Sequence, residues 1–168
     1  MSDDQDQSGR RVALVADAGF YVGPALCREL VRRGHHLVVG DPAEGLVEEL
    51  EAEGAQVEVV TGVRNLADPE SAPKLVVAGL ERFGRIDAAA AASGQIVTGR
   101  FVNSSLDDLH KVISGCLEAP YHFLKATVAP MIEAGGGQIL VITSASAARP
   151  TPGAPLYSSA RAGAAMLV

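Results

Sequence analysis

Apolar and polar positions along this chain are grouped in blocks. Five short apolar runs lie at residues 12–16, 37–40, 57–60, 86–92 and 138–143. Continuous apolar runs of this length predict parallel strands that are covered on both faces. The longer amphipathic stretches between them predict helices at residues 23–33, 42–53, 69–83, 106–117, 120–133 and from 156 to the last residue. This order predicts an α/β fold, a Rossmann-like doubly wound parallel sheet with helices on both faces.

Local signals mark the ends of several of these helices. Gly34, Gly54 and Gly84 follow the first three, and glycine is the preferred residue just beyond a helix. Ser105 stands three residues before Asp108, which resembles a capping box. A proline at 120 is expected to start or kink the continuation of the fourth helix.

The pattern predicts one domain and no internal linker. Residues 1–10 are polar and acidic and are expected to form a flexible leader, and residues 11–168 a single Rossmann-like domain. The last predicted helix extends to Val168, and no C-cap or polar tail follows it in this sequence. We therefore expect the natural fold to continue, since the usual last strands of such a sheet are lacking.

Composition excludes several classes of function. The 168 residues are 48% hydrophobic and 20% charged, which excludes a disordered chain. The net charge of −6 offers no basic face for nucleic acid, and no apolar run reaches the ~18–20 residues of a membrane helix. Cys27 and Cys116 are too few for a disulfide framework or a metal site. We expect a cytoplasmic protein without metal, nucleic acid or membrane partners.

The loop after the first predicted strand is where a Rossmann fold binds phosphate groups. Gly19 and Gly23 are present, but Asp17 and Tyr21 occupy positions where a dinucleotide-binding loop needs glycine. A tyrosine ring would fill the space of the pyrophosphate, and a carboxylate would repel it. Two interpretations stay open: a divergent loop that still binds NAD, or a helix N-terminus that binds a small anion while Tyr21 blocks the nucleotide.

Asp41 directly follows the second predicted strand. An acidic residue at this position holds the adenosine ribose in NAD-binding folds. The same residue before a proline is also typical of a helix N-cap. Both hypotheses predict aspartate, so the residue does not discriminate between them.

Three residues near the end of the chain form a candidate catalytic set. Ser144 lies just past the fifth predicted strand, where open α/β sheets bind their ligands. Tyr157 lies at the start of the last helix, and Arg161 follows four residues later on the same helix face. A permanent positive charge stabilises a tyrosinate, which can then act as a base, while a serine hydroxyl holds the substrate oxygen.

These residues are similar to the short-chain dehydrogenase/reductase superfamily, in which Ser and Tyr-x-x-x-Lys stand where Ser144, Tyr157 and Arg161 stand here. The resemblance covers residues 11–168, like the N-terminal two-thirds of such a protein. Other family motifs differ: Asn-Asn-Ala-Gly corresponds to residues 91–94, ending at Gly94, and a family asparagine to Cys116. The family lysine relays protons, and an arginine is not expected to release one.

One branch of the superfamily, the halohydrin dehalogenases, resembles the chain more closely. It uses Ser, Tyr and Arg, and it carries an aromatic residue in the former glycine loop, as Tyr21 and Gly23 do here. The resemblance implies a cofactor-independent lyase that converts vicinal halohydrins to epoxides, with Ser144 holding the hydroxyl and Tyr157, activated by Arg161, removing its proton. The halide ion would lie near Tyr21, Gly19 and Gly23.

Two alternatives remain at this point. The first is an NAD(P)-dependent short-chain oxidoreductase for alcohol or ketone substrates, with a divergent cofactor loop, Asp41 and Gly94 binding NAD. The second is an inactive Rossmann domain that serves as a binding module. In each enzyme hypothesis the partner is a small-molecule substrate, and the family resemblance implies a homo-oligomer, a tetramer.

Overall fold

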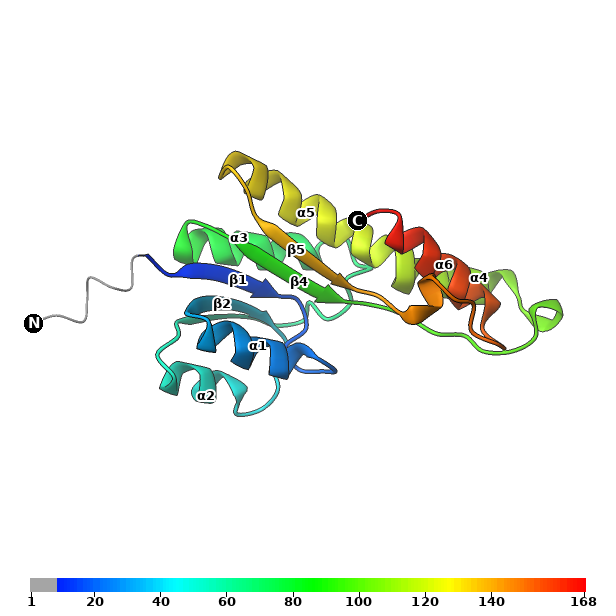
Figure 1. The fold of residues 1–168 in the computed structure, drawn as a ribbon, viewed down its shortest axis with the longest axis horizontal. Helices are drawn as coiled ribbons and strands as arrows, with labels where there is room; N and C mark the ends of the chain where they lie inside the picture. Colours follow the sequence, from blue (N-terminus) through cyan, green and yellow to red (C-terminus); the bar gives the residue numbers. More distant parts are fainter. Residues whose placement is uncertain (1–8) are drawn as a thin grey trace, which may run out of the picture.

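The computed structural model describes residues 9–168, so most of the predicted leader lies outside the described residues. Five parallel strands form one sheet in the order β3-β2-β1-β4-β5 (Figure 1). Each strand overlaps one of the five predicted apolar runs; the strands are β1 (Arg11–Val15), β2 (His35–Gly40), β3 (Val57–Val60), β4 (Ala88–Ala92) and β5 (Gln138–Ile142). The strand order reverses between β1 and β4, which makes the crevice at their carboxyl ends the expected place for a ligand.

Helices cover the two faces of the sheet (Figure 1). Two of them, α1 and α2, lie on one face, and α3 and α5 lie on the other. The helices are α1 (Gly23–Arg32), α2 (Leu46–Ala52), α3 (Ser71–Phe83), α4 (Leu106–Ile113), α5 (Ala119–Glu133) and α6 (Pro155–Ala165). The doubly wound α/β fold predicted from the sequence is therefore confirmed.

Strand β1 shows why residues 12–15 include no polar side chain. Val12 and Leu14 pack into the core formed with α3 and α5, while Ala13 and Val15 pack into the core formed with α1 and α2. All four side chains are at most 2% exposed. Both faces of the strand are buried, so neither face can carry polar side chains.

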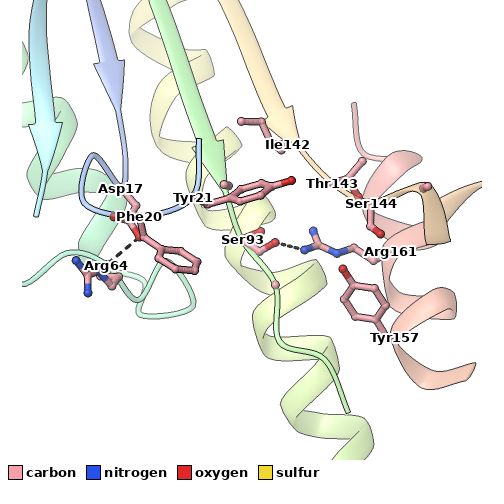
Figure 2. Close-up of a pocket in the computed structure, with 13 residues that line it drawn as sticks. Asp17, Phe20, Tyr21, Arg64, Ser93, Ile142, Thr143, Ser144, Tyr157 and Arg161 are labelled. Carbon is pink, nitrogen blue, oxygen red and sulfur yellow. Dashed lines mark hydrogen bonds and ion pairs between the residues drawn. The ribbon is translucent and has the colours of Figure 1, made fainter. Parts of the chain in front are cut away.

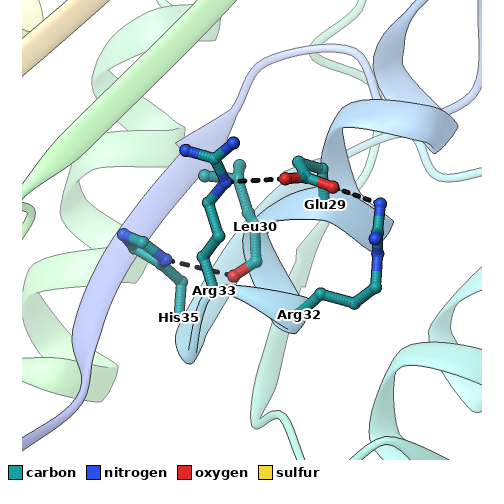
Figure 3. Close-up of polar contacts among 5 residues, drawn as sticks. All are labelled: Glu29, Leu30, Arg32, Arg33 and His35. Carbon is teal, nitrogen blue, oxygen red and sulfur yellow. Dashed lines mark hydrogen bonds and ion pairs between the residues drawn. The ribbon is translucent and has the colours of Figure 1, made fainter.

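The junction between α1 and β2 is held by local polar contacts (Figure 3). The imidazole Nδ1 of His35 donates to the carbonyl of Leu30 at 3.0 Å, which satisfies one of the last carbonyl groups of α1. Glu29 pairs with Arg33 at 2.7 Å and with Arg32. The hydrogen bond from Arg33 and the charge of Arg32 lower the pKa of Glu29. These contacts link the last turn of α1 to the start of β2.

Helices α4 and α5 are joined by one turn of π-helix, Ser114–Glu118. Ser105 and Asp108 form the predicted capping box at the start of α4, because each side chain accepts the backbone amide of the other residue. Pro120 has no amide hydrogen and stands in the first turn of α5. The wider π-helical turn accommodates this proline without breaking the helix.

Two predicted helix boundaries are wrong. Helix α2 begins at Leu46, after Gly45 in the left-handed region, and Asp41 also has a positive φ of 41°. Asp41 is therefore not the N-cap of this helix. Helix α6 begins at Pro155 and ends at Ala165, so it does not continue to Val168.

Candidate active site

A cavity of about 490 Å³ opens at the carboxyl ends of β1, β4 and β5, at the topological switch point (Figure 2). It is bounded by the loop after β1, the segment after β4, the segment after β5 and the first turns of α6. Its wall is formed by Asp17, Phe20, Tyr21, Arg64, Ala92, Ser93, Gly94, Ile142, Thr143, Ser144, Ala145, Tyr157 and Arg161. The three predicted catalytic residues and Tyr21 are all among them.

Ser144 lies two residues beyond β5, and its side chain is half-buried in the cavity wall. Its backbone is extended, with φ −140° and ψ 151°, and it caps a short 3-10 turn, Ala145–Ala147. The Ser144 Oγ accepts the amide of Ser146 at 3.2 Å. Because that amide uses one lone pair of the oxygen, the hydroxyl proton stays available to a ligand in the cavity.

Tyr157 and Arg161 lie one helical turn apart on α6, as their spacing predicts. The Arg161 guanidinium carbon lies 5.2 Å from the centre of the Tyr157 ring, within the range of a cation–π contact. Tyr157 is half-buried, whereas Arg161 is only 5% exposed. The helix thus presents the tyrosine to the cavity with a buried positive charge beside its ring.

The buried guanidinium of Arg161 has few polar partners. One terminal nitrogen donates to the carbonyl oxygen of Ser93, just after β4. The other two nitrogens, Nε and Nη1, are buried without a hydrogen-bond partner, and so is the hydroxyl of Ser93. No carboxylate is ion-paired to Arg161 in residues 9–168. The site therefore holds a positive charge that its surroundings do not neutralise.

The loop after β1 is stabilised by its own carboxylate. The Oδ1 atom of Asp17 accepts the amide of Gly19 at 3.0 Å, and Oδ2 lies 3.5 Å from the guanidinium of Arg64. The Gly19 amide is one of the groups that a phosphate would use in a dinucleotide-binding loop. In this structure the Asp17 carboxylate already occupies the place of an anion there.

Tyr21 extends from the same loop across the cavity towards Ser144 and Arg161 (Figure 2). Its φ of 55° lies in the left-handed region, where glycine is favoured, and its side chain is 70% exposed. Phe20, also exposed at 69%, lines the cavity beside it. Two aromatic rings thus stand where a glycine loop would leave room for a pyrophosphate.

The N-terminus of α1 has few free donors. The Gly23 amide donates to the carbonyl of Phe20 at 3.0 Å, Pro24 has no amide hydrogen, and the Leu26 amide donates to Val22 at 2.9 Å. A Cβ at position 23 would lie 2.0 Å from the Asp17 carbonyl oxygen, so Gly23 serves close packing. The expectation that Gly19 and Gly23 bind a halide or phosphate through backbone donors is thereby weakened, although Tyr21 does line the cavity.

Asp41 has a role that neither hypothesis about it predicted. Its two carboxylate oxygens accept the amides of Gly62 at 2.7 Å and Val63 at 2.8 Å. The side chain thus ties the end of β2 to the turn after β3. Asp41 does not line the cavity, and a ribose contact by it remains a prediction.

Sequence reasoning missed Arg64 and Phe20 as lining residues, and it treated Ser93 only as part of a diverged motif. Arg64 follows β3 by four residues, and its place after a strand of a parallel sheet was the available signal for it. No local pattern indicated that Ser93 would contact Arg161, which is 68 residues away.

No group of three or more potential metal ligands occurs in residues 9–168. No helix in that part of the chain is long and apolar enough to cross a membrane.

The family model for short chain dehydrogenases matches residues 11–168. The chain belongs to the short-chain dehydrogenase family. An uncharacterised NAD-dependent oxidoreductase of Mycobacterium tuberculosis is 31% identical in an alignment that covers 90% of this chain and 61% of the relative. A 2,5-dichloro-2,5-cyclohexadiene-1,4-diol dehydrogenase of Sphingobium indicum is 26% identical over 90% of this chain and 62% of the relative.

Solved structures of the family have the same fold. An alcohol dehydrogenase from Thermococcus sibiricus, complexed with 5-hydroxy-NADP, superposes with a TM-score of 0.84 at 30% identity, covering 95% of this chain and 68% of that one. A 3-oxoacyl-[acyl-carrier protein] reductase from Brucella melitensis, in complex with NAD, gives 0.83 at 26% identity, covering 95% and 65%.

The chain spans less than two thirds of the length of the two curated relatives named above. By name these relatives are an oxidoreductase and a dehydrogenase, so the family part of the sequence interpretation is confirmed. Neither the relatives nor the solved structures named here support the halohydrin dehalogenase branch.

Proposed function

We propose that this chain carries the proton-transfer site of a short-chain dehydrogenase-family enzyme that acts on the hydroxyl group of a small substrate, or in reverse on its carbonyl group. The observation that carries the proposal is the buried Arg161 guanidinium beside the ring of Tyr157, on the wall of a cavity that Ser144 also lines. A purely structural domain has no use for an unneutralised buried charge at this place.

Each residue has one role in this proposal. The Ser144 hydroxyl donates to the substrate oxygen and orients it in the cavity. Tyr157 takes the proton from the substrate hydroxyl in one direction and returns it in the other. Arg161 places a positive charge beside the ring of the tyrosine and does not exchange a proton itself.

The relatives favour alcohol or ketone oxidoreduction as the overall reaction. Two curated relatives are a dehydrogenase and an NAD-dependent oxidoreductase by name, and two solved structures contain NAD or a derivative of NADP. In such a reaction a bound nicotinamide supplies the hydride chemistry. The proton transfer proposed for Tyr157 is the half of that reaction that this chain's own residues perform.

The first loop, however, does not fit a dinucleotide. The Asp17 carboxylate already accepts the amide of Gly19, Pro24 lacks an amide hydrogen in the first turn of α1, and Tyr21 lies across the cavity. A pyrophosphate would meet a carboxylate and an aromatic ring in place of free amides. We therefore derive no hydride step for this chain.

A second candidate, which needs no dinucleotide, is a halohydrin dehalogenase-like lyase, and the presence of Ser144, Tyr157 and Arg161 on one cavity wall supports it. Tyr157 would remove the proton of the substrate hydroxyl, and the resulting alkoxide oxygen would attack the neighbouring carbon. The carbon–halogen bond would break, and the halide would leave with the bonding electron pair. The products are an epoxide, a halide ion and a proton that passes from Tyr157 to solvent, so the reaction needs no external oxidant or reductant.

Calorimetric titration with NAD⁺ and NADH separates the two reactions. If Asp17 and Tyr21 exclude the dinucleotide, the parent protein gives no heat of binding, while the Asp17→Gly/Tyr21→Gly variant gains measurable affinity. Saturable micromolar binding to the parent protein would instead support oxidoreduction and reject the lyase. Folding of both proteins is checked by circular dichroism.

Activity tests address the proton-transfer site itself. Halide release from vicinal halohydrins is measured without cofactor, and alcohol oxidation is measured with NAD⁺ or NADP⁺. Tyr157→Phe should reduce the rate of whichever reaction occurs by at least about 100-fold, in line with the loss of a general base. Tyr121→Phe, a half-exposed tyrosine on α5, is the matched control. Equal rates for the two variants would refute the proposal.

A further inference from the structure

We propose that residues 93–95, the segment directly after β4, form a seat that holds Arg161 against Tyr157, and that Gly94 is its positioning residue. The proposal rests on the proposed function only for its catalytic consequence. The contacts that define the seat can be tested without any substrate.

The position of Gly94 leaves no room for a side chain. A Cβ built there would lie 1.8 Å from the terminal Nη2 nitrogen of Arg161 and 2.7 Å from its Cζ carbon. The same Nη2 nitrogen donates to the carbonyl oxygen of Ser93, the residue before it. The guanidinium therefore lies directly against the backbone of residues 93 and 94, a contact that only glycine permits at position 94.

The seat is itself anchored on the opposite side. The Cys116 sulfur accepts the amide of Gln95 at 3.4 Å and donates to the carbonyl of Gln95 at 3.5 Å. Gly115 also allows close approach, because a Cβ there would lie 2.7 Å from the Cβ of Gln95. Both residues belong to the π-helical turn Ser114–Glu118. This turn thus fixes the segment after β4, and that segment fixes the arginine on α6.

The arrangement gives Gly94 a role that does not depend on a cofactor. In its place against residues 93 and 94, Arg161 is only 5% exposed, and its guanidinium faces the Tyr157 ring. A side chain at position 94 would push the guanidinium out of this place and towards solvent. The charge would then no longer be held beside the tyrosine.

Phenylglyoxal modification of arginine, followed by peptide mass spectrometry, measures whether Arg161 is seated. The exposed Arg149 in the same sample is the internal reference. Gly94→Ala should raise the rate of Arg161 modification relative to Arg149 by at least about 10-fold. Gly99→Ala is the matched control, because Gly99 has a similar φ of 144° but open space where a Cβ would lie. It should leave Arg161 protected.

A second variant covers the case in which Gly94→Ala does not fold. Gly94→Ala/Arg161→Lys removes the guanidinium that the new Cβ would meet, so this double variant should fold when the single variant does not. Where Gly94→Ala does fold, it should lose the activity found in the assays above, with kcat falling more than KM rises. Arg161 protection in folded Gly94→Ala equal to that in the parent protein would overturn the proposal. Failure of the double variant to fold, while Gly99→Ala folds, would also overturn it, since backbone strain at the φ of 150° and not contact with the guanidinium would then explain the glycine.

Discussion

Replacing Arg161 by methionine is expected to make the fold more stable, although it removes a member of the proposed site. The guanidinium is 5% exposed, it forms one hydrogen bond, to the Ser93 carbonyl, and it has two buried nitrogens without partners. Methionine is similar in length and flexible, so it can fill the space without a polar group. The substitution therefore removes a desolvation cost while keeping most of the packing.

The magnitude follows from the groups that change. Each of the two unpartnered nitrogens costs about 1–3 kcal/mol of unmet hydrogen bonding. The two nitrogens belong to a charged group, so their combined cost is about 5 kcal/mol. Against this, the hydrogen bond from the charged guanidinium to Ser93 contributes about 2 kcal/mol and the cation–π contact with Tyr157 about 1 kcal/mol. With about 5 kcal/mol on one side and about 3 on the other, Arg161→Met should stabilise the protein by about 2 kcal/mol.

Urea unfolding followed by circular dichroism is the direct assay, with the midpoint and slope compared between the variant and the parent protein. A gain of about 2 kcal/mol corresponds to a rise in Tm of roughly 4–8 °C for a chain of this size. Arg149→Met is the control, because Arg149 is exposed and its replacement should change the free energy of unfolding by less than about 0.5 kcal/mol.

Destabilisation by Arg161→Met of more than about 1 kcal/mol would refute this reasoning. It would mean that the guanidinium contributes more to the fold than its one hydrogen bond and its ring contact provide. The expected gain would instead identify Arg161 as a residue kept at the expense of stability, as is common for charged groups in catalytic sites.

Three further predictions concern other parts of the fold. Burial raises the pKa of Asp87, but the hydrogen bond from Arg85 and the backbone bond and charges around it outweigh burial and lower the pKa overall. The stabilisation by the Asp87 carboxylate is thus complete above the unfolded pKa of about 3.9 and is lost as the pH falls through the lower folded pKa. Asp87→Asn should therefore cost about 1 kcal/mol in urea unfolding at pH 7, and the cost should become smaller as the pH is lowered below about 3.9. Ser105→Ala should lower the free energy of unfolding by about 1 kcal/mol through loss of the capping box, and an undiminished urea midpoint would show that the cap contributes nothing. Cys116→Ala and Cys27→Ala remove equally buried thiols, and only Cys116→Ala should expose Arg161 to phenylglyoxal. Burial raises the pKa of the Cys27 thiol to about 12, so this thiol should resist iodoacetamide in the folded protein at pH 8.

Much of the candidate site could be predicted because its key spacing is local. Tyr157 and Arg161 share one helix face by a spacing of four residues, and Ser144 lies just beyond a strand that its apolar run identifies. The contacts of Arg161 with Ser93 and Gly94 join segments nearly 70 residues apart, and no periodicity describes such a pair. The sequence therefore indicated three residues that line the cavity but not the segment that contacts Arg161.

The loop after β1 was likewise predicted in part from the sequence, while its contacts are known only from the structure. Its departure from a glycine loop was visible in Asp17 and Tyr21, but the use of the Gly19 amide by Asp17 depends on how the loop folds back on itself. For Asp41, the sequence offered two local interpretations, while its observed partners, Gly62 and Val63, lie 21 and 22 residues further along the chain. They become neighbours only because β2 and β3 pair in parallel.

The sequence by itself determined the order of strands and helices, since each apolar run overlaps one strand. The signal is strongest in β1, where residues 12–15 are buried on both faces and burial disfavours polar side chains. It also determined the local caps and the helical pairing of Tyr157 with Arg161. Only the tertiary structure decided which backbone groups remain free to bind a ligand and which side chains are buried without partners. These properties depend on contacts between distant segments, and the parallel sheet brings those segments together at one edge.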